Sequence, residues 1–297
     1  MKKEINIFGN SSSETSAKII LLPIPYDFTT TDKNKSSSQT ANQILDSSFQ
    51  IDNFSIDFPP INEKDIWMKK IDRIDIDLND SYKEQFNLYY QSINYLSFSF
   101  VSNYWKRYLN HANSNHTQIL SDFQVKIEKY LNKNKIIGVI GGDHSNALPN
   151  IKAYTKKNKF SILQIDAHAD LRTKYFGVES SHASLMYNII KDKKTWSNIS
   201  TLIQLGLRDI CQEEYQIIKN NKKIKPYFSS DISKRMFEGE NWKEIVDDII
   251  ENLDEKIYIS FDIDGLTPEH CLNSGFPVPG GINYEQIYYL FKKILNY

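Results

Sequence analysis

The sequence has few cysteines, no excess of one charge and no long apolar runs, and each absence excludes a class of protein. The two cysteines among its 297 residues, Cys211 and Cys271, lie far apart without a CxxC spacing, so neither a disulfide framework nor a zinc-thiolate site is indicated. The formal net charge is -1 and no basic run is interleaved with aromatics, so nucleic acid is not an expected partner. No apolar run approaches the roughly 20 residues that span a bilayer, and the first residues lack the apolar core of a signal peptide. We therefore expect a cytoplasmic protein with no membrane partner.

The chain does contain strand-like apolar runs that alternate with amphipathic helical spacing. Helices are expected from Ser81 to about Leu109 and from His116 to Leu131, whereas residues 50–80 are expected to be irregular and residues 1–17 poorly anchored. The alternation predicts a three-layer α/β/α sandwich with a mostly parallel central sheet. We see no linker, so a single domain over residues 1–297 is expected. The strand-like runs are residues 18–24, 136–140, 160–165, 199–206, 225–228 and 256–261.

Three of these runs end in carboxylate and imidazole side chains. They lead into GGDHS at 141–145, DAHAD at 166–170 and SFDID at 260–264. Alternate side chains of an extended backbone point the same way, so the aspartates and the histidine of DAHAD can converge on one point. The ends of parallel strands share one edge of a sheet, where α/β proteins place their sites. A metal site is therefore expected at this edge, whereas a lone pair such as Asp75 and Asp77 is weak evidence.

The ordered motifs GGDHS, DAHAD and SFDID resemble those of the ureohydrolase superfamily of arginases and agmatinases. The resemblance covers residues 20–53, 138–215 and 256–282 and is closest to bacterial agmatinase-family proteins. It implies an arginase-like fold, C-terminally incomplete, with two Mn²⁺ ions as cofactors. It also implies a small guanidino substrate and assembly into a homo-oligomer, either a trimer or a hexamer.

Carried over position by position, the resemblance implies two metal ions bridged by Asp166 and Asp262. Four carboxylates and two imidazoles form an oxygen-rich set that suits manganese better than a thiolate-seeking ion. His182, in the stretch SHAS, matches the proton-shuttling histidine of the family and is the implied catalytic residue. The implied ligands are His144, Asp166, Asp170 and Asp262 for one ion, and Asp166, His168, Asp262 and Asp264 for the other.

The reaction implied is hydrolysis of a guanidino C–N bond, most simply of agmatine to putrescine and urea. Residues 170–177 resemble agmatinases more than arginases. Arginases carry a further Asp two residues after the Asp of the GLRD motif, where this chain has Cys211, so arginine is disfavoured. The alternative substrate is formimidoylglutamate, which carries an amidine, or a guanidino acid.

The sequence also departs from the family pattern. Thr267 stands where the family usually has Asp, and Phe276 and Pro277 lie in a loop that usually reads GTGTP. In the family, a further strand and a guanidinium-binding Glu follow the helix matching 283–296, and neither has a counterpart before Tyr297. That strand lies between those carrying the GGDHS and SFDID motifs. Its loss is expected to leave both strands without a neighbour and to weaken substrate binding, so no substrate-binding residue is assigned.

Two other interpretations remain. Two-metal phosphoesterases also use DxH and Gly-Asp motifs, but in them the DxH comes first, whereas here GGDHS precedes DAHAD. The stronger alternative is a truncated metal-binding homologue without turnover. Any single Asp at a strand end is more often a helix cap or a solvated loop residue, so the metal site depends on the motifs together. His111, His116 and His270 lie outside them and are expected to be structural or exposed.

Overall fold

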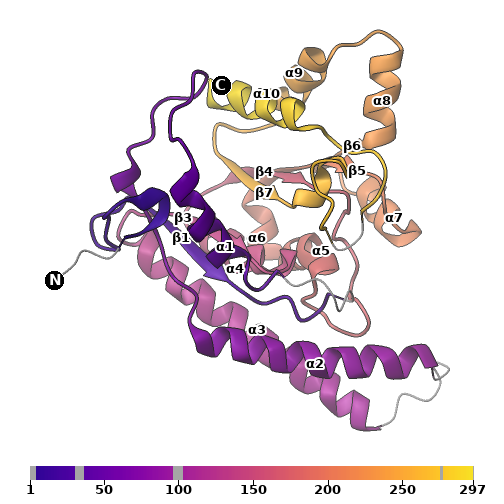
Figure 1. Ribbon diagram of the computed structural model, residues 1–297. Coiled ribbons are helices and arrows are strands. Elements are labelled where there is room, and N and C mark those ends of the chain that lie inside the picture. The colour runs from indigo at the N-terminus through magenta and orange to yellow at the C-terminus, as the bar shows by residue number, and fades with distance from the viewer. Residues whose placement is uncertain (1–4, 31–36, 96–102, 275–276, 297) are drawn as a thin grey trace. The chain divides into compact units, whose positions relative to one another are not determined.

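The chain, shown as a computed structural model in Figure 1, divides by its internal contacts into two compact units. Unit 1 comprises Met1–Tyr154 and Lys174–His182, and unit 2 comprises Thr155–Thr173 and Ala183–Tyr297. Each unit is described by itself, and the single domain stays a prediction. Phe276, in the atypical loop, lies outside the described residues. Those residues are 5–30, 37–95, 103–274 and 277–296.

Unit 1 is a small parallel sheet with helices on both faces. Its elements are β1 (Ile19–Ile24), α1 (Thr40–Ser47), β2 (Ile66–Met68), α2 (Arg73–Tyr95), α3 (Asn103–Leu131), β3 (Ile136–Gly141) and α4 (Leu148–Thr155). The strand order is β2-β1-β3, and all pairs are parallel. Because side chains alternate along β1, Ile20 and Leu22 pack with α3 and α4 while Leu21 packs with α1 on the other face.

The helices of unit 1 differ from the expected ones at their boundaries. Helix α2 begins at Arg73, inside the stretch expected to be irregular, and α3 runs unbroken through residues 110–115, where a gap was expected. The polar sequence HANSN hid the continuity. Tyr108, Ala112 and His116 are nonetheless buried at four-residue spacing, so one stripe of α3 faces the core. Residues 96–102 of the first expected helix lie outside the described part.

Residues 5–17 are anchored, contrary to expectation. The side-chain amide of Asn6 donates to the carbonyl of Met68 at 2.9 Å, and its oxygen accepts from the Met68 N–H at 2.7 Å. Ile7 and Ala17 are buried beside the sheet. The segment was misjudged because its polar asparagines satisfy backbone groups of β2, a long-range contact that composition does not reveal.

His116 gives unit 1 a pH-dependent stability. It is 1% exposed, neither ring nitrogen has a hydrogen-bond partner among the described residues, and the Phe28 ring packs against it. Burial lowers its pKa from 6.5 to about 4. Between these values the unfolded chain binds a proton that the folded chain does not, so stability is full above about pH 6.5 and falls as the pH drops towards 4.

Between pH 7 and pH 4.5, wild type should lose roughly 2–3 kcal/mol more folding stability than His116→Leu, because the leucine has no group that titrates. Urea unfolding of both proteins at the two pH values measures this difference. His111→Gln is the matched control, because His111 is exposed on the same helix and its loss should leave the pH difference unchanged. An identical pH difference in wild type and His116→Leu would contradict the assignment.

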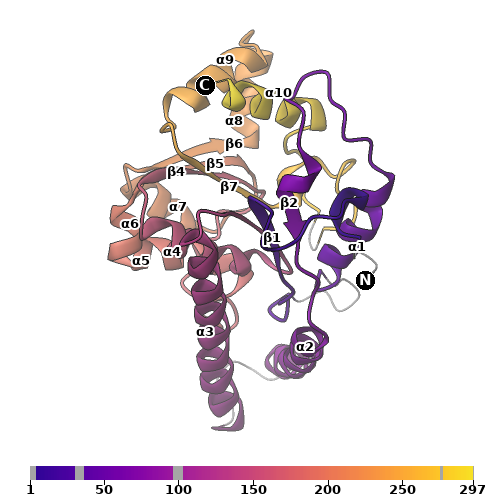
Figure 2. The ribbon, with the colours of Figure 1, turned by 90° about the vertical axis from the view of Figure 1, so that its left-hand side faces the viewer.

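Unit 2 is a three-layer α/β/α arrangement built on a four-stranded parallel sheet of order β6-β5-β4-β7. Helices α8, α9 and α10 cover one face and α5, α6 and α7 the other (Figures 1 and 2). The predicted α/β fold with parallel strands is confirmed. The elements are β4 (Phe160–Ile165), α5 (Leu185–Lys191), α6 (Lys193–Ser197), β5 (Ile199–Leu207), α7 (Gln212–Asn220), β6 (Ile224–Phe228), α8 (Ser229–Phe237), α9 (Trp242–Glu251), β7 (Ile257–Phe261) and α10 (Tyr284–Leu295).

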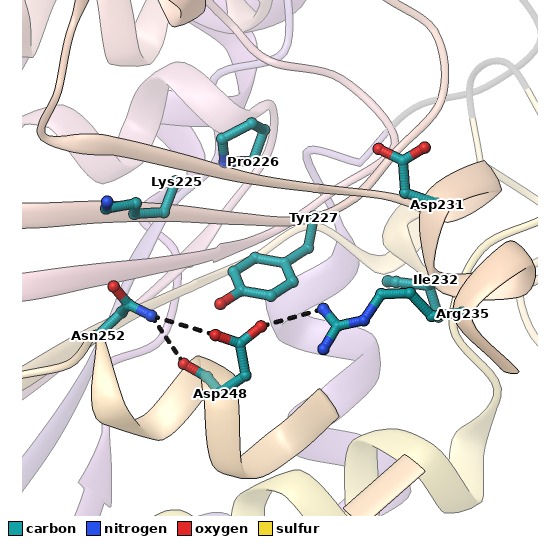
Figure 3. Close-up of a pocket in the computed structure, with 8 residues that line it drawn as sticks. All are labelled: Lys225, Pro226, Tyr227, Asp231, Ile232, Arg235, Asp248 and Asn252. Carbon is teal, nitrogen blue, oxygen red and sulfur yellow. Dashed lines mark hydrogen bonds and ion pairs between the residues drawn. The ribbon is translucent and has the colours of Figure 1, made fainter. Parts of the chain in front are cut away.

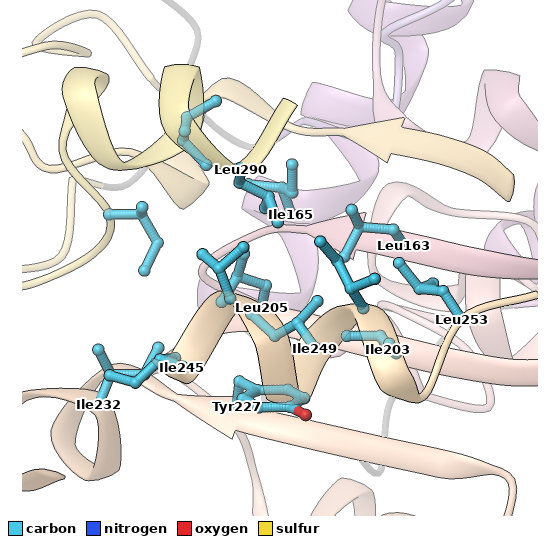
Figure 4. Close-up of a cluster of buried hydrophobic side chains, with 14 residues drawn as sticks. Leu163, Ile165, Ile203, Leu205, Tyr227, Ile232, Ile245, Ile249, Leu253 and Leu290 are labelled. Carbon is cyan, nitrogen blue, oxygen red and sulfur yellow. The ribbon is translucent and has the colours of Figure 1, made fainter. Parts of the chain in front are cut away.

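The core of unit 2 lies between the sheet and α8, α9 and α10 (Figure 4). Leu163 and Leu205 on the strands pack with Ile245 and Ile249 of α9 and with Leu290 of α10. The helix residues recur at spacings of three and four, which places them on one face. Both α9 and α10 start with capping boxes, in which an Asn N-cap and the residue three positions later exchange side-chain and backbone hydrogen bonds.

Strands β3 and β7 each have a neighbour on one side only. Among the described strands, β3 pairs with β1 alone and β7 with β4 alone. On β7, Ile259 and Phe261 are 40% and 41% exposed. These two strands, β3 and β7, lead into the GGDHS and SFDID motifs. In the described part of the chain, no helix combines the length and apolar character needed to cross a membrane.

Candidate metal centre

The register between β4 and β7 places two of the sequence motifs side by side. Ile165, the last residue of β4, pairs with Phe261, the last of β7. The backbone N–H of Asp262 donates to the carbonyl of Ile165 at 2.9 Å, and the N–H of Asp166 donates to Leu205 at 3.0 Å. DAHAD and the DID of SFDID therefore begin at the same level of the sheet, at the carboxyl ends of its strands.

Three of the predicted ligands in unit 2 come together. Asp166, His168 and Asp264 each offer one ligand atom, and these atoms lie within 4.8 Å of one another. His168 Nδ1 is 3.2 Å from Asp264 Oδ2 and 3.5 Å from Asp166 Oδ1. Two carboxylates and an imidazole within this span fit a divalent cation, and the absence of thiolate disfavours a soft metal.

The charges of this cluster are strongly coupled. Burial disfavours the charged form of His168, but its hydrogen bonds and charge interactions with Asp166 and Asp264 outweigh burial and raise its pKa to about 11. In the absence of an ion, the imidazolium balances the carboxylates. A cation bound there would take over this role and displace the proton, since metal ligands must be deprotonated.

His144 and His182 lie in unit 1, so their grouping with the ligands of unit 2 stays a prediction. His144 follows β3 and opens a short 3-10 helix, His144–Ala147, capped by the Asp143 side chain. His182 Nδ1 lies 2.9 Å from Thr29 Oγ1. Burial raises the pKa of Asp143 to about 6, against the opposing effect of its hydrogen bonds.

Three further predicted residues, Asp170, Asp262 and Thr267, contact neighbouring protein groups. Asp170 is buried and has a positive φ of 53°, and its carbonyl accepts from the Tyr187 N–H at 3.1 Å. Asp262 caps a short 3-10 helix, its Oδ1 accepting from the Asp264 N–H at 3.1 Å. Thr267 Oγ1 lies 2.9 Å from His270 Nδ1. The ligand roles of Asp170 and Asp262 stay predictions. The pair Asp75 and Asp77 lies instead in the first turns of α2.

The model of the protein family described as Arginase family matches residues 17–296 of this chain. The chain belongs to the arginase family. An N(1)-aminopropylagmatine ureohydrolase of Thermus thermophilus is 32% identical over 169 residues, which cover 57% of this chain and 53% of the relative. The hepatic arginase of Aquarana catesbeiana is 30% identical over 172 residues, covering 53% of each. The chain thus spans about half the length of the curated relatives it matches.

Solved structures show the same fold at low identity. The agmatine ureohydrolase of Thermoplasma volcanium gives a TM-score of 0.65 at 17% identity, covering 98% of this chain and 81% of that one. A likeness at this identity establishes the fold alone.

Two buried glutamines support the candidate ligands Asp166 and His168 of this arginase-family chain. Gln164 Nε2 donates to Asp166 Oδ2 at 2.8 Å and to the carbonyl of His168 at 3.2 Å. Gln204 Nε2 donates to Gln164 Oε1 at 2.7 Å and to the carbonyl of Ala169 at 2.8 Å. The sequence analysis missed both. The available signal was a polar residue inside an apolar strand run, two positions before Asp166 and therefore on the same side of the strand.

Replacing Gln164 with Leu should weaken metal binding by about 10- to 100-fold, because hydrogen bonds to a ligand orient it. Titration calorimetry with Mn²⁺ measures the change. Gln118→Leu, at an exposed site of α3, is the control and should bind like wild type. Unchanged affinity in a folded Gln164→Leu protein would show that this contact does not orient Asp166.

The Arg208 side chain binds backbone carbonyl groups of the loop that follows β7. Its guanidinium donates to the carbonyls of Asp264 at 2.6 Å, Leu266 at 3.0 Å and Val278 at 3.0 Å. The sequence analysis used its GLRD motif only to compare substrates and missed this role, since carbonyl partners leave no mark in a sequence. The arrangement fixes the backbone from which the Asp264 carboxylate projects.

The hollow shown in Figure 3 lies elsewhere in unit 2 and contains none of the motif residues. Its volume is 370 Å³, and Tyr227, Arg235 and Asp248 contribute to its wall. The Arg235 guanidinium is held by Asp248 at 3.0 Å and by Glu240. Because the guanidinium is already paired with two carboxylates, the hollow offers no unpaired arginine to an anionic ligand.

Proposed function

We propose that this chain is a metal-dependent hydrolase that cleaves a guanidino C–N bond, with agmatine as its substrate. The observation that carries the proposal is the convergence of Asp166, His168 and Asp264 at the ends of β4 and β7 in an arginase-family chain. The printed names of the matched relatives, aminopropylagmatine ureohydrolase and arginase, support guanidino chemistry.

The residues fit a site for two manganese ions. Asp166, His168, Asp262 and Asp264 would hold one ion, and His144, Asp166, Asp170 and Asp262 the other. When bound, such a pair lowers the pKa of water and polarises the substrate. The carboxylates also place negative charge at this edge of the sheet, so a cationic guanidinium would be drawn to it.

His182 would serve as the group that carries a proton to the departing amine. An imidazole suits this task because its ordinary pKa lies near neutrality. Hydrolysis then yields urea and, from agmatine, putrescine.

Cys211 favours agmatine over arginine. Cys211 is the N-cap of α7, and its backbone N–H donates to Glu214 Oε2 at 3.0 Å. It offers no carboxylate for an α-amino group, which arginine has and agmatine lacks. The second candidate is formimidoylglutamate, which carries an amidine, or a guanidino acid other than arginine.

The test incubates the chain, reconstituted with Mn²⁺, separately with agmatine, N(1)-aminopropylagmatine, arginine and formimidoylglutamate. Urea and the amine product are quantified, and we expect agmatine to give both in equal amounts. Release of glutamate from formimidoylglutamate, with no urea from agmatine, would overturn the substrate. A folded chain that binds manganese and turns over none of the four would support the metal-binding homologue instead.

Two further measurements complete the proposal. Release of phosphate from an aryl phosphate, with no urea from any guanidine, would favour the phosphoesterase interpretation. We also propose a homo-oligomer, trimeric or hexameric, which analytical ultracentrifugation of the reconstituted chain tests directly; a monomer would contradict it.

A further inference from the structure

We propose that Thr29 is a positioning residue that holds His182 in the tautomer with its proton on Nδ1. The catalytic meaning of this assignment rests on the proposed function, whereas the contacts themselves all lie within unit 1. Thr29 Oγ1 is 2.9 Å from His182 Nδ1, 2.9 Å from Asp143 Oδ2 and 3.3 Å from the backbone nitrogen of His182.

The hydrogen-bonding capacity of the hydroxyl decides where the protons lie. A threonine hydroxyl has one proton and two lone pairs. The backbone N–H of His182 can only donate, so it takes one lone pair. The Asp143 carboxylate can only accept, so it takes the proton. The lone pair that remains can satisfy His182 only if Nδ1 carries a hydrogen.

The surroundings of the Asp143 carboxylate make it an acceptor of hydrogen bonds. Its Oδ1 accepts from both the backbone N–H and the hydroxyl of Ser145, while Oδ2 faces Thr29. Three donors converge on this one carboxyl group. Its own backbone N–H donates to the carbonyl of Tyr26 at 2.8 Å, so the residue is held at the end of β3. The orientation of the Thr29 hydroxyl is therefore set from the Asp143 side.

The other tautomer conflicts with this arrangement. With its proton on Nε2, His182 would require the Thr29 hydroxyl to donate to Nδ1. Thr29 Oγ1 and Asp143 Oδ2 would then face each other at 2.9 Å as two acceptors, and a buried polar group would lose its partner. Thr29 is completely buried, and the Tyr175 ring packs against the imidazole with centroids 4.8 Å apart. The burial of Thr29 and the packing of the Tyr175 ring both oppose rotation of the His182 side chain.

The two ring nitrogens of His182 therefore have different roles. Nδ1 carries the fixed proton towards Thr29, and Nε2 carries the lone pair. Nε2 is then the nitrogen that takes up and releases a proton during turnover. Thr29 does not need to touch the substrate to have this effect.

The test is ¹⁵N NMR of the histidine rings in the full chain at pH 8, without added manganese because that ion broadens the signals. The chain has six histidines, and a His182→Gln variant assigns the signal of interest. Wild type should show His182 protonated at Nδ1. Thr29→Val, which removes the hydroxyl and keeps the shape, should shift the population towards Nε2–H, and Thr29→Ser should restore wild-type behaviour.

Kinetics of the manganese-loaded chain provide the second readout. Thr29→Val should lower kcat roughly 10-fold with little change in KM, since general acid–base catalysis contributes about 10²- to 10⁴-fold and only part of it is lost. Thr30→Val is the matched control, because it removes a neighbouring hydroxyl bonded to the Asp27 carbonyl and should change neither readout.

The two proposals fail in different ways. A wild-type His182 protonated at Nε2 would overturn the tautomer assignment whether or not the chain is active. The expected NMR result in a chain with no turnover would support the assignment and count against the proposed function. A shifted tautomer in Thr29→Val with unchanged kcat would overturn the positioning role.

Discussion

Replacing Asp166 with Asn is expected to abolish manganese binding and to lower urea release from agmatine at least about 10³-fold. Asp166 belongs to the cluster with His168 and Asp264 and is proposed to bridge both ions. The amide is nearly the same size but carries no charge, so two cations would lose the ligand they share. Metal content per chain and steady-state urea release measure the two effects.

Asp77→Asn is the matched control for this change. Asp77 belongs to the other alternating carboxylate pair of the sequence, but it lies on α2, exposed and paired with Arg73 at 2.9 Å. Its loss should alter neither metal content nor turnover. An Asp166→Asn chain that still holds two ions would show that Asp166 is not a bridging ligand.

Replacing Gly265 with Ala is expected to cost about 3 kcal/mol of folding stability and to empty the metal site. A Cβ at this position would lie 2.6 Å from the backbone nitrogen of Asp166 and 2.9 Å from the carbonyl carbon of Ile165. Those atoms belong to the end of β4 and cannot move without shifting Asp166 itself. Overpacking of this kind typically costs 1–3 kcal/mol, and backbone contacts leave little room for relief.

Urea unfolding and metal content test the Gly265→Ala prediction together. Gly138→Ala is the control, because the only atom its Cβ would approach closely is the end of the flexible Leu21 side chain. It should cost clearly less stability and leave the metal content unchanged. If Gly265→Ala matched wild type in both measurements, the close contact between the loop after β7 and the end of β4 would be contradicted.

The sequence reveals the cluster of unit 2 because a local rule determines it. Asp166 and His168 alternate at the end of one strand, Asp264 follows another, and parallel strands end at one edge. The same rule excludes Asp75 and Asp77, because they do not follow directly on an apolar strand and lie instead in α2. Fold class follows equally directly from the alternation of strands and helices.

Most of the residues that the sequence analysis missed act through contacts between distant positions of the chain. Arg208 donates to the carbonyls of Asp264, Leu266 and Val278, which lie 56 to 70 positions away, and Thr29 contacts His182 across 153 positions. Gln164 is the exception, because Asp166 lies only two positions from it and a polar residue inside an apolar strand was an available signal. Nothing local distinguishes Arg208 and Thr29 from other side chains of their type. The anchoring of Asn6 to Met68 was missed for the same reason, because its partner lies 62 positions along the chain.

The most direct test of the account is the number of manganese ions bound per folded, monodisperse chain after reconstitution. The ligand set formed by the three motifs predicts two ions per chain, and both should be lost when Asp166 is replaced with Asn. Little or no bound manganese in a folded chain would contradict the proposed metal centre and, with it, the hydrolase.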